Sequence, residues 1–404
     1  MKRLCTLLLL LVFSPLLLLA QGWVGTWATA PQSVVKRFMP YNNEMTNRSV
    51  RQVIRVSIGG ELVRLKLSNE ISTEPVLIES IYIAHSIDSC DIDMRSARYM
   101  RFNGSHRVTI PAGKAITSDA LTFKVNPLER LAITINYRKA PKKPTVHMGS
   151  RTTSYILKGQ TTPYANFKKA FREDHWFNIS ALDVFDKTAS SVAILGNSIT
   201  DGKGATLNAN DRWTDFMATH LHTAVKNTTS KLGNVGVLNL GIGFNMVLST
   251  GFGQPAIVRF DRDILGQSKV KNIIIFEGIN DIGTTKHPES IAKELITAYE
   301  EMIRKAHKHG IKVWGGTILP FKGNKVYYTE IREKARQDVN KWIRESKAFD
   351  GIIDFDELMR DATVPEQLKS HIHAGDWLHP NPAGYKMMGA YAAKVLLDSV
   401  ASTN

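Results

Sequence analysis

The chain has 404 residues, of which 43% are hydrophobic and 22% charged, a composition typical of globular proteins and a length sufficient for two domains. Its 52 Lys and Arg residues outnumber 37 Asp and Glu residues, which gives a formal net charge of +15. A charge of this sign favours anionic surfaces such as uronic-acid polysaccharides, nucleic acid or acidic lipid. Because the basic residues are scattered and no basic motif interleaved with aromatic residues is present, we expect no nucleic-acid partner.

The first twenty residues have the pattern of a secretion signal. Two basic residues precede an apolar run from Leu4 to Leu19, which predicts a signal peptide over residues 1–20 that is cleaved near Ala20. The run is slightly short for a membrane span, so we expect no stable membrane insertion after cleavage. Cleavage removes Cys5 and leaves Cys90 alone, which excludes an intrachain disulfide and a cysteine-based metal site. We therefore expect a secreted or periplasmic protein.

Residues 21–187 show a period of two, which predicts an all-β domain. Trp23 and Trp27 fit buried strand aromatics better than an exposed sugar platform. The charged and aromatic stretch Asn166–Trp176, with the residues that follow it, is interpreted as the connection between domains. Several short strands with turn residues between them indicate a sandwich of jelly-roll type. The clearest strand candidates are Val50–Ser57, Glu61–Leu67, Pro75–Ala84, Leu121–Val125 and Leu131–Tyr137.

Residues 188–404 alternate between strand and helix patterns, which predicts an α/β domain with a parallel five-stranded sheet between helix layers, of the flavodoxin-like type. The predicted strands are Val192–Leu195, Gly236–Leu240, Asn272–Glu277, Lys312–Gly315 and Gly351–Asp354. The predicted helices are Arg212–Val225, Ile257–Leu265, Glu289–His309, Glu330–Glu345 and Ala383–Val400.

The stretch Ser191–Lys203 places a serine directly after the first buried strand of this domain. A Walker A loop is excluded because five residues, not four, separate Gly196 from Gly202. A polar strand-to-helix turn would explain most serines of this kind. The third interpretation is a catalytic nucleophile at Ser198, which requires a histidine base and an orienting acid elsewhere.

Asp376 and His379 supply that acid and base on one proline-bounded turn, so that both side chains can face one cleft. His373 is the nearest rival base, but no aspartate precedes it by three residues. His307 and His309 lie near the end of a basic helix, and His371 and His373 precede the turn, so all four are interpreted as structural.

Together, Gly-Asn-Ser-Ile-Thr-Asp-Gly at 196–202, Gly-Ile-Asn-Asp at 278–281 and Asp376-Trp-Leu-His379 resemble the SGNH, or GDSL-type, hydrolase family. The resemblance covers roughly residues 191–397, and the start of the chain looks like the two-domain members. It implies a triad of Ser198, His379 and Asp376, with no metal or organic cofactor. It also implies oxyanion donors from the Ser198 N–H, a backbone N–H of the second block and the Asn280 amide.

Two positions depart from the family pattern. Asn197 stands where aspartate is usual, and it can form the same turn. Phe244 stands where the oxyanion glycine is expected, and a positive φ would strain it there. Either the turn uses Gly243 instead, or Phe244 narrows the acyl pocket, or activity is reduced; we favour the narrowed pocket. Glu277 and Asp281, which flank Asn280, are interpreted as structural acids.

The resemblance implies an esterase that acts on acylated carbohydrate, with O-acetyl groups of plant cell-wall polysaccharide as the favoured substrate. A lipid acyl esterase or lysophospholipase is the first alternative. A carbohydrate-binding protein with a weakened hydrolase site is the second. The sequence leaves the oligomeric state open.

Overall fold

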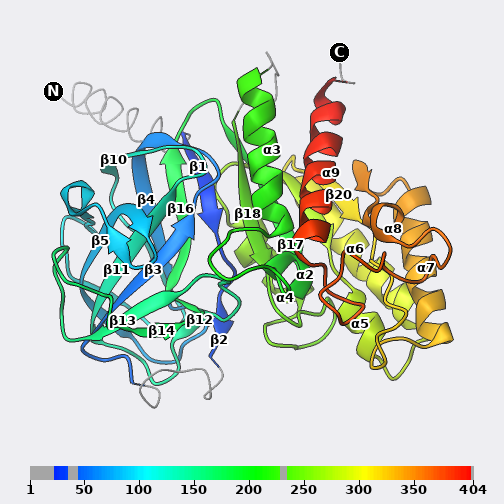
Figure 1. The fold of residues 1–404 in the computed structure, drawn as a ribbon, viewed down its shortest axis with the longest axis horizontal. Coiled ribbons are helices and arrows are strands. Elements are labelled where there is room, and N and C mark those ends of the chain that lie inside the picture. Colours follow the sequence, from blue (N-terminus) through cyan, green and yellow to red (C-terminus); the bar gives the residue numbers. More distant parts are fainter. Residues whose placement is uncertain (1–21, 35–43, 228–233, 402–404) are drawn as a thin grey trace, which may run out of the picture.

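The computed structural model describes residues 22–34, 44–227 and 234–401. The predicted signal peptide over residues 1–20 lies outside these ranges. Two domains lie side by side, β strands in one and alternating strands and helices in the other (Figure 1). No helix within the described ranges combines the length and apolar character that a membrane span requires.

The amino-terminal domain is built from two antiparallel sheets that share one hydrophobic core, with Val63 and Leu65 on one sheet and Ile54 and Ile83 on the other. This arrangement confirms the predicted β-sandwich. The first sheet has the order β1 (Trp23–Ala28), β16 (Ile179–Phe185), β4 (Gly60–Ser68) and β10 (Leu121–Val125), with β9 (Ala115–Thr117) beside β4. The second has the order β14 (Phe171–Glu173), β13 (Ser154–Lys158), β3 (Arg48–Arg55), β11 (Arg130–Lys139), β5 (Val76–Asp88) and β6 (Asp91–Ile92), with β7 (Arg98–Tyr99) and β8 (Val108–Ile110) beside β5.

A small third sheet lies near the boundary with the other domain, in the order β15 (Trp176–Phe177), β12 (Thr145–His147) and β2 (Gln32–Ser33). Trp23 and Trp27 are each only 7% exposed, so their interpretation as buried strand aromatics is confirmed. The expected connection at Asn166–Trp176 is wrong, because this stretch includes β14 and the start of β15, which belong to sheets of the β domain. The chain instead crosses between the domains at residues 186–189, where Asp186 accepts hydrogen bonds from the N–H groups of Thr188 and Ala189.

The carboxyl-terminal domain contains the predicted parallel sheet. Its order is β18 (Val235–Gly241), β17 (Ser190–Gly196), β19 (Val270–Phe276), β20 (Lys312–Gly316) and β21 (Gly351–Ile353). Numbered within the domain this is 2-1-3-4-5, the flavodoxin-like order, in which ligands bind at the carboxyl ends of the strands where the order reverses. The first strand, β17, ends at that point, so the residues that follow it are placed at the expected ligand site.

Helices flank this sheet as predicted. The long helices α3 (Trp213–Asn227) and α9 (Pro382–Ala401) lie against each other (Figure 1), and α6 (Ile291–Lys308) contacts α7 (Glu330–Glu345). The predicted helix Ile257–Leu265 is α4 (Ala256–Phe260) followed by a π-helical turn, η3 (Asp261–Leu265). The shorter helices are α2 (Ser198–Asp201), α5 (Ile279–Thr284) and α8 (Phe355–Met359), with a 3₁₀ turn η2 (Met94–Ser96) in the β domain.

The two domains meet where β1 lies against the edge strand β18. The backbones approach so closely that a Cβ atom on Gly236 would lie 1.9 Å from the Gly25 carbonyl oxygen. The N–H of Val237, on the open edge of the parallel sheet, donates to the Ser57 hydroxyl at 2.9 Å. The β domain therefore covers an edge that would otherwise present unpaired backbone groups. Among the residues that the structure describes, Cys90 is buried and forms no disulfide.

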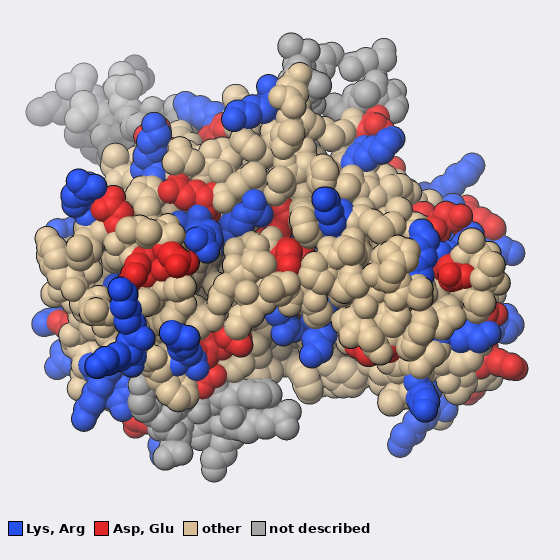
Figure 2. Space-filling model, in the orientation of Figure 1, with Lys and Arg blue, Asp and Glu red and all other residues tan. Residues whose placement is uncertain are grey.

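Basic and acidic side chains are interspersed over the face shown in Figure 2, where Lys and Arg do not gather into one continuous patch. The excess of positive charge is thus distributed on this face, in agreement with the scattered pattern in the sequence.

Candidate active site

Ser198 follows β17 as the first residue of the short helix α2. A Cβ atom on Gly196 would lie 2.2 Å from the Thr200 hydroxyl, so only glycine permits this turn. The Asn197 side chain caps the helix by accepting the Ile199 N–H at 3.0 Å, which confirms that asparagine makes the expected turn. As the first helical residue, Ser198 has a backbone N–H without an intrahelical acceptor, free to bind an anionic group.

The structure brings Ser198, His379 and Asp376 together across 181 residues of sequence. The Ser198 hydroxyl lies 2.8 Å from His379 Nε2, and His379 Nδ1 lies 2.6 Å from an Asp376 carboxylate oxygen. The other Asp376 oxygen accepts the N–H groups of Leu378 and His379 at 3.0 and 2.9 Å. Partial burial acts to raise the pKa of Asp376, but the hydrogen bonds from His379 outweigh it and hold the pKa well below its usual range. Asp376 is therefore ionised and fixes the ring tautomer with Nε2 facing the serine.

His373 supports this turn and does not contact Ser198. Its ring stacks on Trp377 with centroids 4.0 Å apart, and its Nδ1 accepts the N–H groups of Gly375 and Trp377. Trp377 has φ of +57°, an unfavourable value for a tryptophan, and its ring packs against Gly323, where a Cβ would lie 2.6 Å away. Burial lowers the pKa of His373, which keeps the Nδ1 lone pair available as an acceptor. The structural interpretation of His373 thus fits the geometry.

The Asn280 side chain is fixed at both ends in the pocket. Its amide nitrogen donates to the Asn245 carbonyl at 2.7 Å, and its amide oxygen accepts the Tyr327 hydroxyl at 2.8 Å. These bonds leave one amide N–H of Asn280 for a ligand. Burial raises the pKa of Tyr327 to about 12, so its hydroxyl remains a donor. No sequence motif indicated Tyr327, which lies in a loop distant from every motif.

Phe244 occupies the strained conformation that the sequence analysis considered, with φ of +53°. Gly243 does not adopt a positive φ, so the left-handed position of the turn has not moved to it. The Phe244 carbonyl packs against Gly251, and its ring lies 5.3 Å from the Phe252 ring. Among the described residues the Phe244 N–H has no hydrogen-bond acceptor, so it can serve a ligand.

Buried charges behind the pocket hold the loop that carries Phe244. The Asp281 carboxylate accepts the N–H groups of Val247 and Leu248 at 2.9 to 3.0 Å, and burial raises its pKa to about 6. Burial also raises the pKa of Glu277 to about 8, and Glu277 accepts the Asn197 amide at 3.2 Å. Both acids contact backbone or side chains and not Ser198, in agreement with a structural role.

Fully buried Arg259 joins the ends of neighbouring strands to this network. It donates to the carbonyls of Gly196 at 3.2 Å and Leu240 at 2.8 Å, and to the Asn245 side chain at 2.9 Å. Its ion pair with Asp263 balances the buried charge. Arg259 therefore fixes the turn before Ser198 relative to the loop before Phe244, which no local sequence pattern indicated.

A pocket of about 460 Å³ contains Ser198, His379, Asn280 and Phe244. Part of its wall comes from the β domain, which the sequence analysis did not foresee. The residues that this domain contributes are Gln32, Met148, Gly149, Arg151, Asp174 and His175. Within the described ranges no group of three or more His, Cys, Asp or Glu side chains is placed to hold a metal ion.

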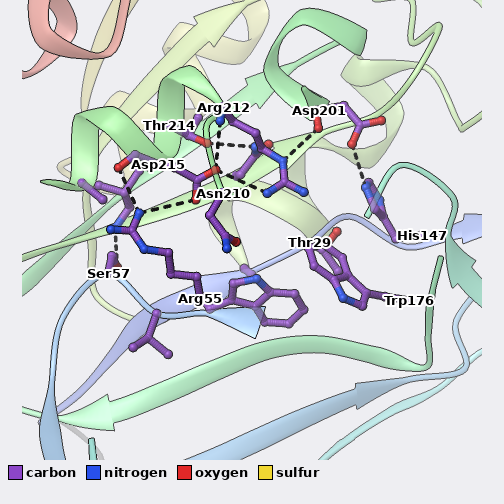
Figure 3. Close-up of a pocket in the computed structure, with 16 residues that line it drawn as sticks. Thr29, Arg55, Ser57, His147, Trp176, Asp201, Asn210, Arg212, Thr214 and Asp215 are labelled. Atoms are coloured by element: carbon purple, nitrogen blue, oxygen red, sulfur yellow. Dashed lines mark hydrogen bonds and ion pairs between the residues drawn. The ribbon is translucent and has the colours of Figure 1, made fainter. Parts of the chain in front are cut away.

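The β domain also contacts the helix of Ser198 through a buried pair, shown in Figure 3. His147 Nε2 lies 2.9 Å from an Asp201 carboxylate oxygen, and its Nδ1 bonds the Ala30 carbonyl. Burial acts to raise the pKa of Asp201, but His147 and the nearby arginines lower it. Arg212 continues the network by donating to the Asp201 carbonyl at 3.0 Å. These residues line an enclosed cavity of about 40 Å³ between the domains.

Residues 194–387 match the model of the GDSL-like lipase/acylhydrolase family. The carboxyl-terminal domain belongs to this family. Members of the GDSL-like lipase/acylhydrolase family are carboxylic ester hydrolases, so this GDSL-like protein is an enzyme of that class. The matched range contains Ser198, Asn280, Asp376 and His379, and it excludes the whole β domain.

Solved structures similar to this chain cover about half of it. A lipase/acylhydrolase from Enterococcus faecalis is 17% identical, with 52% of this chain and 96% of that chain covered and a TM-score of 0.39. A member of the lipolytic G-D-S-L family from Veillonella parvula is 18% identical, with 51% of this chain and 97% of that chain covered and a TM-score of 0.36. A mutant acetyl-xylooligosaccharide esterase from Geobacillus is 19% identical, covering 51% and 94%, with a TM-score of 0.38. No curated protein matches this chain.

Proposed function

We propose that this GDSL-like enzyme is a secreted or periplasmic serine esterase that removes short acyl groups, chiefly O-acetyl, from carbohydrate, with plant cell-wall polysaccharide as the favoured source. The observation that supports catalysis best is the continuous chain of short contacts from the Ser198 hydroxyl through His379 to Asp376, 2.8 and 2.6 Å. Such a chain is the arrangement that activates a serine for attack on an ester.

In this proposal Ser198 Oγ attacks the ester carbonyl carbon while His379 Nε2 takes the hydroxyl proton. The proton passes to the alcohol oxygen as the ester C–O bond breaks, which leaves an acyl group on Ser198. Water then attacks the acyl-enzyme, with His379 again as the base, and the carboxylic acid leaves. Asp376 stabilises the imidazolium that forms in each half of the reaction. The tetrahedral oxyanion binds the N–H groups of Ser198 and Phe244 and the free amide N–H of Asn280.

The preference for short acyl groups is supported by Phe244. Its positive φ fixes a phenyl ring beside the proposed oxyanion site, and the Phe252 ring lies next to it. Strained conformations of this kind concentrate at functional sites because the surrounding structure must hold them. A ring in this position leaves room for an acetyl methyl group and disfavours longer chains, which argues against a lipid acyl esterase.

The experiment compares hydrolysis of 4-nitrophenyl acetate by the mature chain and by Ser198→Ala. Loss of the hydroxyl lowers kcat by about 10⁴-fold or more, because the remaining groups cannot form an acyl-enzyme. Ser346→Ala, a change at an exposed hydroxyl at the end of α7, serves as the matched control and retains full activity. Acetate release from acetylated xylan and pectin, beside fatty-acid release from lysophospholipid, then identifies the substrate class. Equal hydrolysis by Ser198→Ala and the wild type would contradict the assigned nucleophile, and no hydrolysis by either would favour the carbohydrate-binding alternative.

A further inference from the structure

The pocket has two unlike flanks. Phe244 and Phe252, both from the hydrolase domain, form the apolar flank assigned above to the acyl group. Residues 148–151 of the β domain approach on the flank of α2. There Gly149 lies so close to Asp201 that a Cβ would meet its carboxylate at 2.0 Å. With the acyl group against the apolar flank, the alcohol half of the ester can extend to this second flank, because both flanks line the same pocket.

Arg151 is the distinctive residue of the second flank. Its guanidinium has no hydrogen-bond or ion-pair partner among the residues that the structure describes, and its Nε atom is buried without an acceptor. Buried polar groups are nearly always paired, because an unpaired one loses its hydration without compensation. Asp201 lies near enough for the Arg151 charge to lower its pKa, yet its carboxylate bonds to His147. No acidic side chain of the described residues therefore forms a hydrogen bond or salt bridge with Arg151.

The backbone of Arg151 is held in a strained conformation. Its φ is +49°, a value that costs energy for any residue with a Cβ. The loop around Asn208 clamps it, because the Asn208 N–H donates to the Arg151 carbonyl at 2.9 Å and the Asn208 side chain accepts the Thr153 N–H at 2.7 Å. A strained, clamped and unpaired arginine at a catalytic pocket indicates that its side chain is held there for a ligand.

A second free cation lies on the same flank. Lys203 follows α2, and its backbone N–H donates to the Ser198 carbonyl at 2.8 Å, so its position is tied to that of Ser198. Its exposed ammonium group has no partner within the described part of the chain. The one free acid on this wall is Asp174, which is exposed and accepts only a 3.4 Å hydrogen bond from Thr153. Cations thus outnumber free anions where the alcohol half would bind.

We propose that Arg151, assisted by Lys203, binds a carboxylate on the alcohol half of the substrate, so that the enzyme deacylates esters of acidic sugars of the uronic-acid class. The planar fork of an arginine matches the two oxygens of a carboxylate, which a neutral sugar hydroxyl cannot satisfy equally. This inference rests on the proposed esterase function, and it gives the β domain a direct part in substrate selection.

The test measures binding by calorimetry, independently of hydrolysis. The probes are trigalacturonate and a glucuronate-substituted xylo-oligosaccharide, each compared with a counterpart in which every carboxylate is a primary amide. The wild type binds at least one acid about tenfold more tightly than its amide. Added salt reduces this ratio of the affinity for the acid to the affinity for the amide. Arg151→Gln brings the ratio close to one, and Arg151→Lys retains part of it. Arg95→Gln, at a side chain that is 94% exposed, leaves the ratio unchanged.

The inference is overturned if neither acid binds more tightly than its amide, or if Arg151→Gln preserves the ratio. Because affinity is read without turnover, this outcome differs from a failure of the esterase proposal. A chain that discriminates acid from amide but shows no Ser198-dependent hydrolysis of 4-nitrophenyl acetate would contradict only the proposed function. A chain that hydrolyses the ester but does not discriminate would contradict only the inference.

Discussion

At the scale of single residues, the proposed preference for short acyl groups depends on Phe244. Phe244→Gly removes the ring beside the proposed oxyanion site and relieves the backbone strain at φ of +53°. We expect the ratio of butyryl to acetyl ester hydrolysis to rise by about tenfold, the scale on which pocket size discriminates small hydrocarbon groups. Steady-state kinetics on 4-nitrophenyl acetate and butyrate measure this ratio, with Phe252→Ala as the companion variant. A wild type that already hydrolyses butyrate as fast as acetate would contradict the assignment.

Protonation of Glu277 should make the stability of the protein depend on pH. Burial raises its pKa from the ordinary value of 4.5 to about 8, so between these pH values the folded protein holds a proton that the unfolded chain has lost. This contribution to stability is full below the unfolded pKa and is lost as the pH rises through about 8. Glu277→Gln lacks this contribution at every pH. The melting temperature of the variant minus that of the wild type should therefore increase from pH 5 to pH 9. Exposed Glu345→Gln is the control, and parallel pH curves for Glu277→Gln and the wild type would refute the shift.

At the scale of elements, the turn that carries Asp376 and His379 depends on His373. The stacked Trp377 ring and the two N–H bonds to His373 Nδ1 hold a turn that includes a left-handed tryptophan. His373→Ala should lower kcat by about tenfold through misplacement of the base, with the pH profile of kcat keeping its shape. A loss near 10⁴-fold, equal to that of a His379 variant, would instead identify His373 as the base.

The regular elements of the hydrolase domain follow from the sequence, and the irregular ones do not. Buried parallel strands contain continuous apolar runs, such as Ile273–Phe276 in β19, and α7 coincides with the predicted range Glu330–Glu345 because its amphipathic pattern begins at a capping threonine. The prediction of a connection at Asn166–Trp176 failed because β14 and β15 are only three and two residues long, too short to show a period of two in the sequence. Tyr327 and Arg151 were missed because only tertiary packing brings them to the pocket.

At the scale of the whole molecule, the two domains are expected to unfold together. β1 lies on β18, and Gly25 and Gly236 approach with no room for a side chain. Gly236→Ala must push the backbones apart, which costs on the order of 1–3 kcal/mol as other overpacked sites do. Calorimetry should show one unfolding transition in the wild type and a midpoint a few degrees lower in the variant. Two separate wild-type transitions, with only one of them shifted by the variant, would show that the domains are independent.

The position of β1 also bears on how the chain is made. Its residues pair with β16, where Trp23 lies opposite Phe185, and contact β18, which is more distant still in sequence. Contacts between such remote segments form slowly, because a large loop must close before they are gained. During synthesis β1 therefore remains unpaired until β16 and β18 have been made. Refolding followed by the fluorescence of buried Trp23 should be correspondingly slow. Delayed collapse would suit the proposed secreted or periplasmic location, because an exported chain crosses a translocation pore unfolded.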